Sequence, residues 1–174
     1  MNNLTLDEQL CDTWSYFGRN AQFRYEGFHK KLMGHQTVDP AIKWIWNSSC
    51  QPKHKVFGWL LLNDKLSTRN ILRRKKMTLD SYSCEICLTG EEETAQHLFW
   101  GCLFAQQCWG ILNLETNQRG ETSENIMAIK DQLNNQFFMI AVILMCWTIW
   151  RARNEIIFNS NQIGIQESKL FFLK

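Results

Sequence analysis

Proline and glycine are scarce in this sequence, with two prolines and nine glycines among 174 residues. So few turn-forming residues exclude collagen-like and low-complexity structure and argue against a loop-built β-sandwich. A strong charge of one sign is also missing, since 19 basic and 17 acidic residues leave a net charge of +2. The chain as a whole is therefore neither a basic arm nor an acidic tail. Hydrophobic residues make up 45%, with eight Trp and eleven Phe, and predict a single domain with an aromatic-rich core.

A membrane-spanning stretch is missing as well. The longest apolar run, from Phe137 to Trp150, has 14 residues, whereas a spanning helix needs about 20. A buried core helix is the favoured interpretation, and the basic Arg151 and Arg153 behind it leave attachment to a membrane surface as a weaker one. The N-terminus lacks the basic start and apolar run of a secretory signal. Seven cysteines, an odd number, then favour reduced thiols inside the cell, in nucleus or cytoplasm, over disulfides in a secreted protein.

Hydrophobic periodicity predicts a mainly helical chain. The expected helices span 52–62, 67–76, 94–100, 104–112, 123–133, 136–158 and a short segment after 165. Aromatic and polar residues alternate on both sides of Gly18, which is compatible with a short N-terminal β-hairpin within residues 12–32. Residues 78–92 are expected to form loops and turns.

Four residues near the middle of the chain carry its sharpest signal, Cys84-x2-Cys87-x9-His97-x4-Cys102. Two cysteines separated by two residues can wrap a tight turn around one ion, with each thiolate about 2.3 Å from zinc. The histidine and the third cysteine follow closely enough to complete a tetrahedron, and three sulfurs with one nitrogen select zinc over magnesium or calcium. The spacing predicts one structural Zn²⁺ per chain in a zinc-knuckle-like Cys3His site. We accordingly expect three segments: a lead-in at 1–40, a zinc-binding domain at 41–114 and a C-terminal helical segment at 115–174.

The last two of these residues place a condition on the backbone. Positions i and i+5 lie about 140° apart on a regular helix, so His97 and Cys102 cannot converge on an unbroken one. Gly101 precedes Cys102, and glycine readily takes the left-handed conformation that ends helices. We therefore expect Gly101 to turn the chain back. Four protein ligands leave no position for water, so such a zinc would hold the fold and would hydrolyse nothing.

Other interpretations of the cysteines stay open at this point. The four side chains need not meet, and a thioredoxin-like redox pair at Cys84 and Cys87 is weaker because no βαβ pattern surrounds it. Cys108 is a competing ligand, although a buried structural thiol is the more usual role for such a residue. The remaining cysteines have no partner spacing and are expected to be core or incidental residues: Cys11, Cys50 and Cys146.

Charge is unevenly distributed along the chain. Residues 41–77 contain nine basic residues against one acidic residue, a net +8, while residues 78–102 carry −5. On the second expected helix, Arg69, Arg73 and Lys76 are spaced for one face, and such a row can follow a phosphate backbone. The alternatives are a solvated helix face whose basic end suits the helix dipole and, more weakly, a nuclear localisation signal. The candidate nucleic-acid-binding residues are Lys53, Lys55, Arg69, Arg73, Arg74, Lys75 and Lys76.

The sequence contains no recognisable catalytic constellation. Polymerases and two-metal nucleases need clustered carboxylates, and the one tight acidic run is Glu91-Glu92-Glu93. We expect this run on an exposed loop, where it is simply solvated. A glycine-rich phosphate loop and a G-x-S-x-G elbow are both missing. These absences predict a protein that is not an enzyme and has no small-molecule substrate.

Further motifs extend on both sides of the cysteines: Lys43-Trp44-Ile45-Trp46-Asn47-Ser48-Ser49-Cys50-Gln51-Pro52, Trp59-Leu60-Leu61, Leu66-Ser67-Thr68-Arg69, Glu92-Glu93-Thr94, His97-Leu98-Phe99, Phe104-Ala105 and Trp147-x2-Trp150-x2-Arg153-Asn154. Together with the Cys/His spacing, they resemble the reverse-transcriptase zinc-binding domain of plant non-LTR retrotransposons. The resemblance covers about residues 12–158 and is densest at 43–109.

This resemblance implies zinc ligation by Cys84, Cys87, His97 and Cys102 and a role in handling nucleic acid downstream of a polymerase. The chain has neither a polymerase nor an RNase H region, so it resembles an isolated or truncated copy. The leading hypothesis is a zinc-stabilised, non-catalytic module that binds RNA or DNA through a basic helix. The alternative is a structural or protein-interaction domain without nucleic-acid binding, and association with membranes ranks last.

Overall fold

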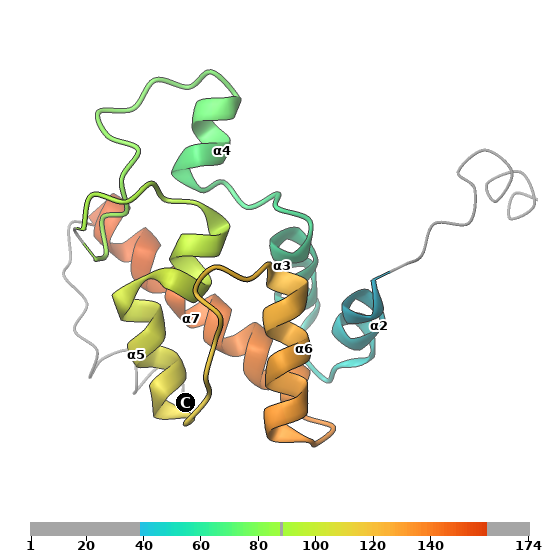
Figure 1. Cartoon of the computed structure of the whole chain (residues 1–174). Helices are drawn as coiled ribbons and strands as arrows, with labels where there is room; N and C mark the ends of the chain where they lie inside the picture. Colours follow the sequence, from blue (N-terminus) through green and yellow to red (C-terminus); the bar gives the residue numbers. More distant parts are fainter. Residues whose placement is uncertain (1–38, 88, 160–174) are drawn as a thin grey trace, which may run out of the picture. The chain divides into compact units, whose positions relative to one another are not determined.

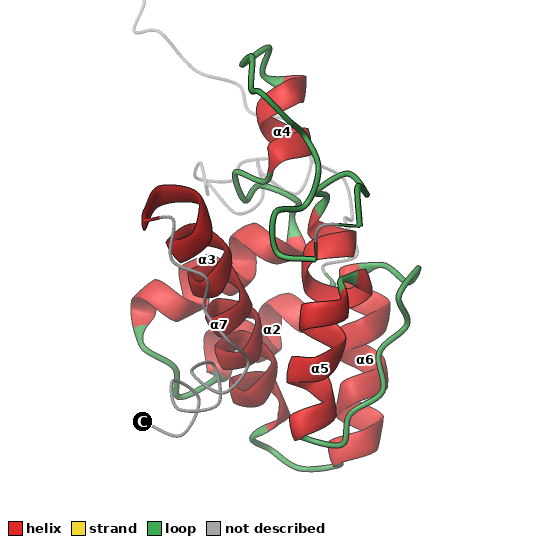
Figure 2. Ribbon diagram, turned by 90° about the vertical axis from the view of Figure 1, so that its left-hand side faces the viewer, coloured by secondary structure: helices red, strands yellow, loops and turns green. Residues whose placement is uncertain are grey.

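The computed structural model describes residues 39–87 and 89–159, and this part of the chain is mainly helical with no strand (Figure 1, Figure 2). Its elements are α2 (Pro40–Asn47), α3 (Pro52–Leu62), α4 (Arg69–Arg74), the π-helical turn η1 (His97–Gly101), α5 (Leu103–Ile111), α6 (Thr122–Leu133) and α7 (Phe138–Asn159). The predicted mainly helical fold is confirmed. The hairpin expected within 12–32 and the short helix expected after 165 lie outside the described residues.

Helix α2 has no counterpart among the expected helices, although the sequence carries a start signal for it. The Ala41 N–H donates a hydrogen bond to the Asp39 carboxylate at 2.8 Å. Pro40 occupies the first turn, where backbone N–H groups have no partner within the helix, so the missing N–H of proline costs no hydrogen bond. Ala41 and Ile45 are buried one turn apart and define the inner face of the helix. The Asp-Pro pair is the sequence signal from which α2 was predictable.

The scarcity of glycine is visible at the ends of three helices. These helices close with Schellman motifs in which the left-handed residue is not glycine; the residues are Asp64, Lys76 and Asn113, with φ values of 50°, 61° and 53°. After α4, the Lys76 N–H donates to the Arg73 carbonyl at 2.9 Å and the Met77 N–H to the Leu72 carbonyl at 3.1 Å. The helix expected to reach Lys76 therefore ends at Arg74, because the left-handed turn closes it.

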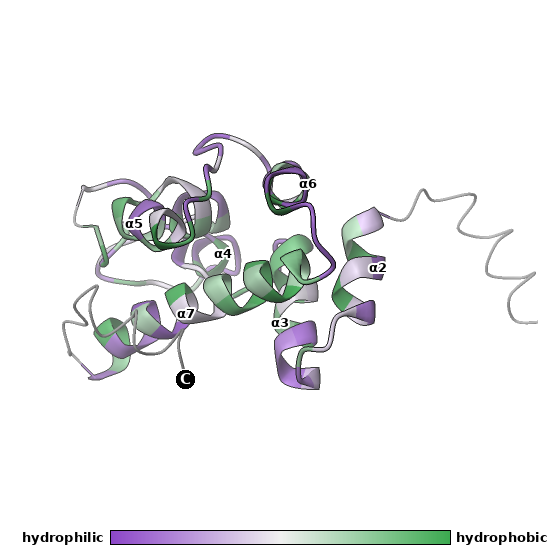
Figure 3. Cartoon of the chain, turned by 90° about the horizontal axis from the view of Figure 1, so that it is seen from below, coloured by the Kyte–Doolittle hydropathy of each residue, from purple (hydrophilic) through white to green (hydrophobic). Residues whose placement is uncertain are grey.

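The long helix α7 forms the centre of the compact unit to which the described residues belong, with α3, α5 and α6 packed around it (Figure 2). Most of its residues up to Trp150 are hydrophobic, and Figure 3 colours much of this part of the helix green, as a helix buried on several sides requires. The buried helix expected over 136–158 is thus confirmed. Within the described ranges, no helix combines the length and the hydropathy needed to cross a membrane.

Aromatic pairs tie this core together. Phe57 of α3 meets Trp147 of α7 edge-on, with 5.1 Å between ring centroids, and Trp100 of η1 stacks on Trp109 of α5 at 5.3 Å. Such pairs contribute about 0.5–1.5 kcal/mol beyond the burial of their area. The Trp109 indole N–H also donates to the Phe99 carbonyl at 2.9 Å, so that no indole donor is lost by burial there. The packing fixes η1 and α5 against α7, and with them the last two Cys/His residues.

Candidate metal centre

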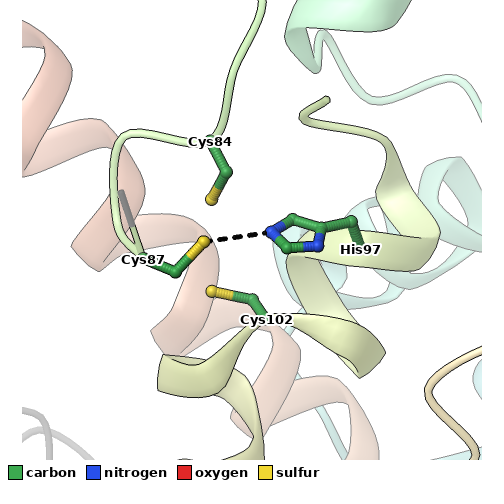
Figure 4. Close-up of side chains that lie close together, drawn as sticks. All are labelled: Cys84, Cys87, His97 and Cys102. Atoms are coloured by element: carbon green, nitrogen blue, oxygen red, sulfur yellow. Dashed lines mark hydrogen bonds between the residues drawn. The ribbon is translucent and has the colours of Figure 1, made fainter. Parts of the chain in front are cut away.

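Figure 4 shows the side chains of Cys84, Cys87, His97 and Cys102 pointing toward one another from two segments of the chain. Their ligand atoms all lie within 4.8 Å of one another. Tetrahedral zinc at ordinary bond lengths places two sulfurs about 3.8 Å apart and a sulfur and a nitrogen about 3.5 Å apart. The distance between Cys87 Sγ and His97 Nε2 is 3.3 Å. The cluster therefore fits one zinc ion after adjustments of a few tenths of an ångström to about one ångström.

The first two cysteines belong to a closed loop, residues 82–93, which we call the knuckle loop. Its ends pair in antiparallel fashion: the Cys84 N–H donates to the Glu91 carbonyl at 2.8 Å and the Glu93 N–H to the Tyr82 carbonyl at 2.9 Å. Gly90 has a φ of 79°, a conformation that favours glycine, and lets the chain return. These two hydrogen bonds close the loop around the Cys-x2-Cys turn.

A π-helical turn brings the last two residues of the cluster together. The Cys102 N–H donates to the His97 carbonyl at 2.6 Å, an i→i+5 bond, and this wider turn replaces the regular helix on which the two side chains would diverge. The expected left-handed Gly101 is wrong, since Gly90 is the one glycine with positive φ in the described part of the chain. Gly101 is needed for space, because a Cβ there would lie 3.3 Å from the Gln118 carbonyl oxygen.

Hydrogen bonds within the cluster shift the pKa values of three of its members, Cys84, His97 and Cys102. A hydrogen bond with Cys102, together with burial, raises the pKa of the Cys84 thiol to about 12. The same hydrogen bond lowers the pKa of Cys102, and the backbone amides of Phe104 and Ala105 at the start of α5 lower it further, against burial. Hydrogen bonds to Cys84 and Cys87 raise the pKa of His97 to about 9, although burial opposes the shift. A metal that binds here must displace protons from these groups.

Glu91 orients the imidazole from outside the cluster. Its carboxylate lies 2.6 Å from His97 Nδ1, on the ring nitrogen that faces away from the sulfurs. An imidazole that donates through Nδ1 keeps the Nε2 lone pair free for a metal, the usual arrangement around zinc-bound histidine. The backbone N–H of His97 also donates a hydrogen bond, to the Thr94 hydroxyl oxygen at 2.9 Å. The sequence motifs contained Thr94, but nothing in the spacing identified Glu91 as a partner of the histidine.

The acidic run 91–93 is only partly the exposed, solvated loop that the sequence predicts, because Glu91 is exposed and Glu93 is not. Glu93 is fully buried, and its carboxylate accepts from Arg153 Nη2 at 2.7 Å and from Nε at 3.2 Å. The same carboxylate accepts from the Arg69 N–H at 3.0 Å, at the start of α4. Since Arg153 belongs to α7 and is itself 4% exposed, the pair links the knuckle loop to two helices. A buried charge requires such a partner.

Three of the predicted nucleic-acid-binding residues have acidic partners at α4. Arg69 pairs with Glu85, Arg73 with Glu92 and Arg74 with Asp64, at 2.7, 2.8 and 3.2 Å. On α3, the Lys55 ammonium donates to the Trp46 carbonyl at 2.9 Å. No hydrogen bond or ion pair of the side chains of Lys53, Lys75 or Lys76 occurs within residues 39–87 and 89–159. Because Lys76 follows the end of α4, the expected row of Arg69, Arg73 and Lys76 on one helix face does not form.

The other described cysteines are not part of the cluster. Cys108 is 1% exposed, and burial raises the pKa of its thiol to about 11. Cys146 is fully buried in α7, and Cys50 is partly exposed. The interpretation of Cys108 as a buried structural thiol is confirmed, and it does not compete for the metal.

Comparison with known proteins agrees with this geometry. A family model described as zinc-binding in reverse transcriptase matches residues 23–109, half of the chain, and the matched range contains all four members of the cluster. No curated protein and no solved structure matches the chain. The chain belongs to the family of zinc-binding domains in reverse transcriptase.

Proposed function

We propose that this chain is a non-catalytic module, derived from the reverse transcriptase of a plant non-LTR retrotransposon, that binds nucleic acid with the support of one structural zinc. Cys84, Cys87, His97 and Cys102 ligate the zinc through three thiolates and one imidazole. All four positions are then occupied by protein, so no zinc-bound water is available for hydrolysis. The thiolates need a reducing environment, which is the reason to place the protein inside the cell.

The observation that carries the proposal is the anchoring of the basic helix α4 on the knuckle loop. The Arg69 N–H donates to the Glu93 carboxylate, and the Asn70 N–H donates to the Glu93 carbonyl at 3.1 Å. The Arg69 guanidinium reaches Glu85 within the Cys-x2-Cys turn. The zinc therefore fixes the segment in which the chain concentrates its positive charge. Positive segments held on a rigid scaffold bind phosphate backbones with little dependence on sequence.

Metal analysis and titration test the proposal. Purified, reduced protein is expected to contain about one zinc per chain and to bind single-stranded RNA or DNA with an affinity that falls as salt rises. The double variant Arg73→Glu/Arg74→Glu, which reverses two exposed charges, is expected to weaken binding at least about tenfold. Purified, reduced protein that contains no zinc and takes none up would contradict the metal assignment, and affinity that is indifferent to salt and to this variant would contradict nucleic-acid binding.

Exposed apolar side chains favour a second candidate, a structural or protein-interaction domain. Phe158 is 74% exposed and Leu103 is 62% exposed. Under this alternative the same zinc maintains the fold, and a protein partner covers these residues. Binding of a protein partner that is lost on Leu103→Ser, in a chain that ignores RNA and DNA, would establish it.

A further inference from the structure

The basic residues around α4 do not all offer their charge to a ligand. On the side of the knuckle loop, Arg69 pairs with Glu85 and Arg73 with Glu92. Arg69 also donates to the Ser81 carbonyl at 2.9 Å. A phosphate that approached Arg69, whose side chain is 14% exposed, would have to displace the carboxylate and the carbonyl that already hold it, and Glu85 and Glu92 add negative charge on this side of α4. This side of α4 is therefore a poor surface for a polyanion.

A different set of residues lines a groove of about 810 Å³ between the end of α3 and α4. Its walls carry the basic residues Lys65, Arg74 and Lys75 and the acidic Asp64, and its apolar lining comes from Leu60 and from Ile71, which is 6% exposed. The Schellman turn after α3 shapes it, because the Lys65 N–H donates to the Leu60 carbonyl at 2.9 Å and the chain turns back there. The groove thus combines three cations and one carboxylate, a net charge of +2, with a small apolar surface. Figure 1 and Figure 2 show α4 at one end of the described unit, with the long following loop beside it.

The positive charges of this groove are available to a ligand. The Lys75 side chain makes no hydrogen bond or ion pair within the described residues. The Lys65 ammonium lies 5.2 Å from the ring centroid of Trp59, a contact that leaves its N–H groups free for an anion. Arg74 has Asp64 as a partner at 3.2 Å, but both side chains are more than half exposed, at 67% and 53%. Exposed pairs of this kind are weak, so a phosphate can compete for the guanidinium.

We propose that this groove binds the backbone of single-stranded nucleic acid, with phosphates on Lys65, Arg74 and Lys75 and a sugar or base face on Leu60. The inference rests on the nucleic-acid-binding function proposed above and changes its location, from a face of α4 to the groove between α3 and α4. Sites for single strands combine a positive track with apolar or aromatic surfaces. A single strand is favoured over a duplex because its unpaired bases are free to contact the apolar lining.

Salt-dependent titration of the full-length, zinc-loaded chain tests this assignment, with fluorescein-labelled oligo(U) and oligo(dT) as the two probes. In Lys65→Gln/Lys75→Gln, two exposed ammonium groups are removed without touching the cluster or the core. If both contact phosphates, the slope of log K against log salt becomes shallower by about 1.4, and affinity falls about tenfold at about 0.15 M salt. The matched control is Lys43→Gln/Arg119→Gln, which removes the same charge from exposed positions outside the groove and is expected to change affinity less than about twofold.

The possible outcomes test the assignment of the groove separately from the proposal that the chain binds nucleic acid. Wild-type binding with an unchanged slope in Lys65→Gln/Lys75→Gln overturns the groove and leaves nucleic-acid binding standing. An equal loss in the control pair also overturns the groove, because total charge and not position would then decide affinity. Failure of the wild-type chain to bind either probe overturns both proposals. A loss of affinity that occurs only in Lys65→Gln/Lys75→Gln supports both proposals. The probe that binds more tightly then shows whether RNA or DNA is preferred.

Discussion

Glu91 acts on the cluster through His97 without belonging to it. In Glu91→Gln, the hydrogen bond to Nδ1 persists in weaker form, since a neutral amide oxygen replaces a carboxylate. Groups that orient a metal-bound histidine typically contribute 10- to 100-fold to metal affinity. We therefore expect zinc affinity to fall by about 10- to 100-fold, measured by competition with a chromogenic chelator.

The neighbouring Glu92 provides the control for this prediction. Glu92→Gln removes a carboxylate from the same loop, but its partner is Arg73 and not a member of the cluster. Zinc affinity of Glu92→Gln is expected to stay within about threefold of wild type, since long-range effects of one exposed charge are small. Equal losses in the two variants would mean that loop charge, and not the orientation of His97, is responsible.

The buried pair of Glu93 and Arg153 is the residue-scale contact with the greatest effect on stability. Either Glu93→Gln or Arg153→Met leaves one charge buried without its partner, which costs about 3–5 kcal/mol of folding free energy. The double variant is expected to lose less than the sum of the two, because neither charge remains. Urea denaturation of the zinc-loaded proteins measures all three values.

An exposed pair in the same region supplies the comparison. Arg74→Met removes the partner of Asp64 at a solvent-exposed site and is expected to cost no more than about 1 kcal/mol. If Arg153→Met costs as little as Arg74→Met, the buried pair does not join the loop to α7 as described.

These residues mark the limit of what the sequence predicts. The four members of the cluster were found because zinc imposes a recognisable spacing on nearby residues. Glu93 and Arg153 are 60 positions apart and carry no local pattern. In the sequence alone, the acidic run that contains Glu93 is expected to be solvated. Its buried partner Arg153 becomes visible only when the packing of α7 is known.

At the scale of elements, the end of α4 gives a prediction that depends on backbone conformation alone. Lys76 has a φ of 61°, a left-handed conformation that is strained for any residue with a Cβ. Lys76→Gly is expected to raise the free energy of unfolding by up to about 1 kcal/mol. Lys75→Gly, at a φ of −81° one residue earlier, is expected to lower it by about 0.5–1 kcal/mol. Urea denaturation checks both, and similar effects of the two substitutions would contradict the strain argument.

Element types were easier to predict than element ends. Apolar periodicity located α3, α5, α6 and α7, because a stripe of buried side chains is imprinted on the sequence. It missed α2, whose capping Asp39 and Pro40 lie at its very start. It also gave the wrong turn before Cys102, since a π-helical turn has no composition signal and Gly101 served for close approach to Gln118 instead.

At the scale of the whole described unit, the knuckle loop connects the metal to α4 and, through Arg153, to α7. The helices around α7 have a large apolar core of their own, whereas α4 is held mainly by polar contacts with the loop. Zinc removal by a chelator is therefore expected to abolish hydrogen-exchange protection in the knuckle loop and α4. Protection in α7 is expected to fall less, because α3, α5 and α6 continue to cover it. Uniform loss of protection in all helices would contradict this division.

Acidification is a second way to remove the metal, and the protonation of the cluster determines that zinc affinity falls as the pH falls. Zinc binds thiolates and neutral imidazole, but in the metal-free protein the pKa of Cys84 is raised to about 12 and that of His97 to about 9. Both groups hold protons at neutral pH, so zinc must displace at least these two protons, and its apparent affinity weakens at least about 100-fold for each pH unit lowered. The stability that zinc contributes is present at high pH and is lost as the pH falls. In Glu91→Gln the release of zinc is expected at higher pH than in wild type, measured with a zinc-sensitive dye during acid titration. Zinc retention independent of pH across this range would contradict ligation by the thiols and the imidazole.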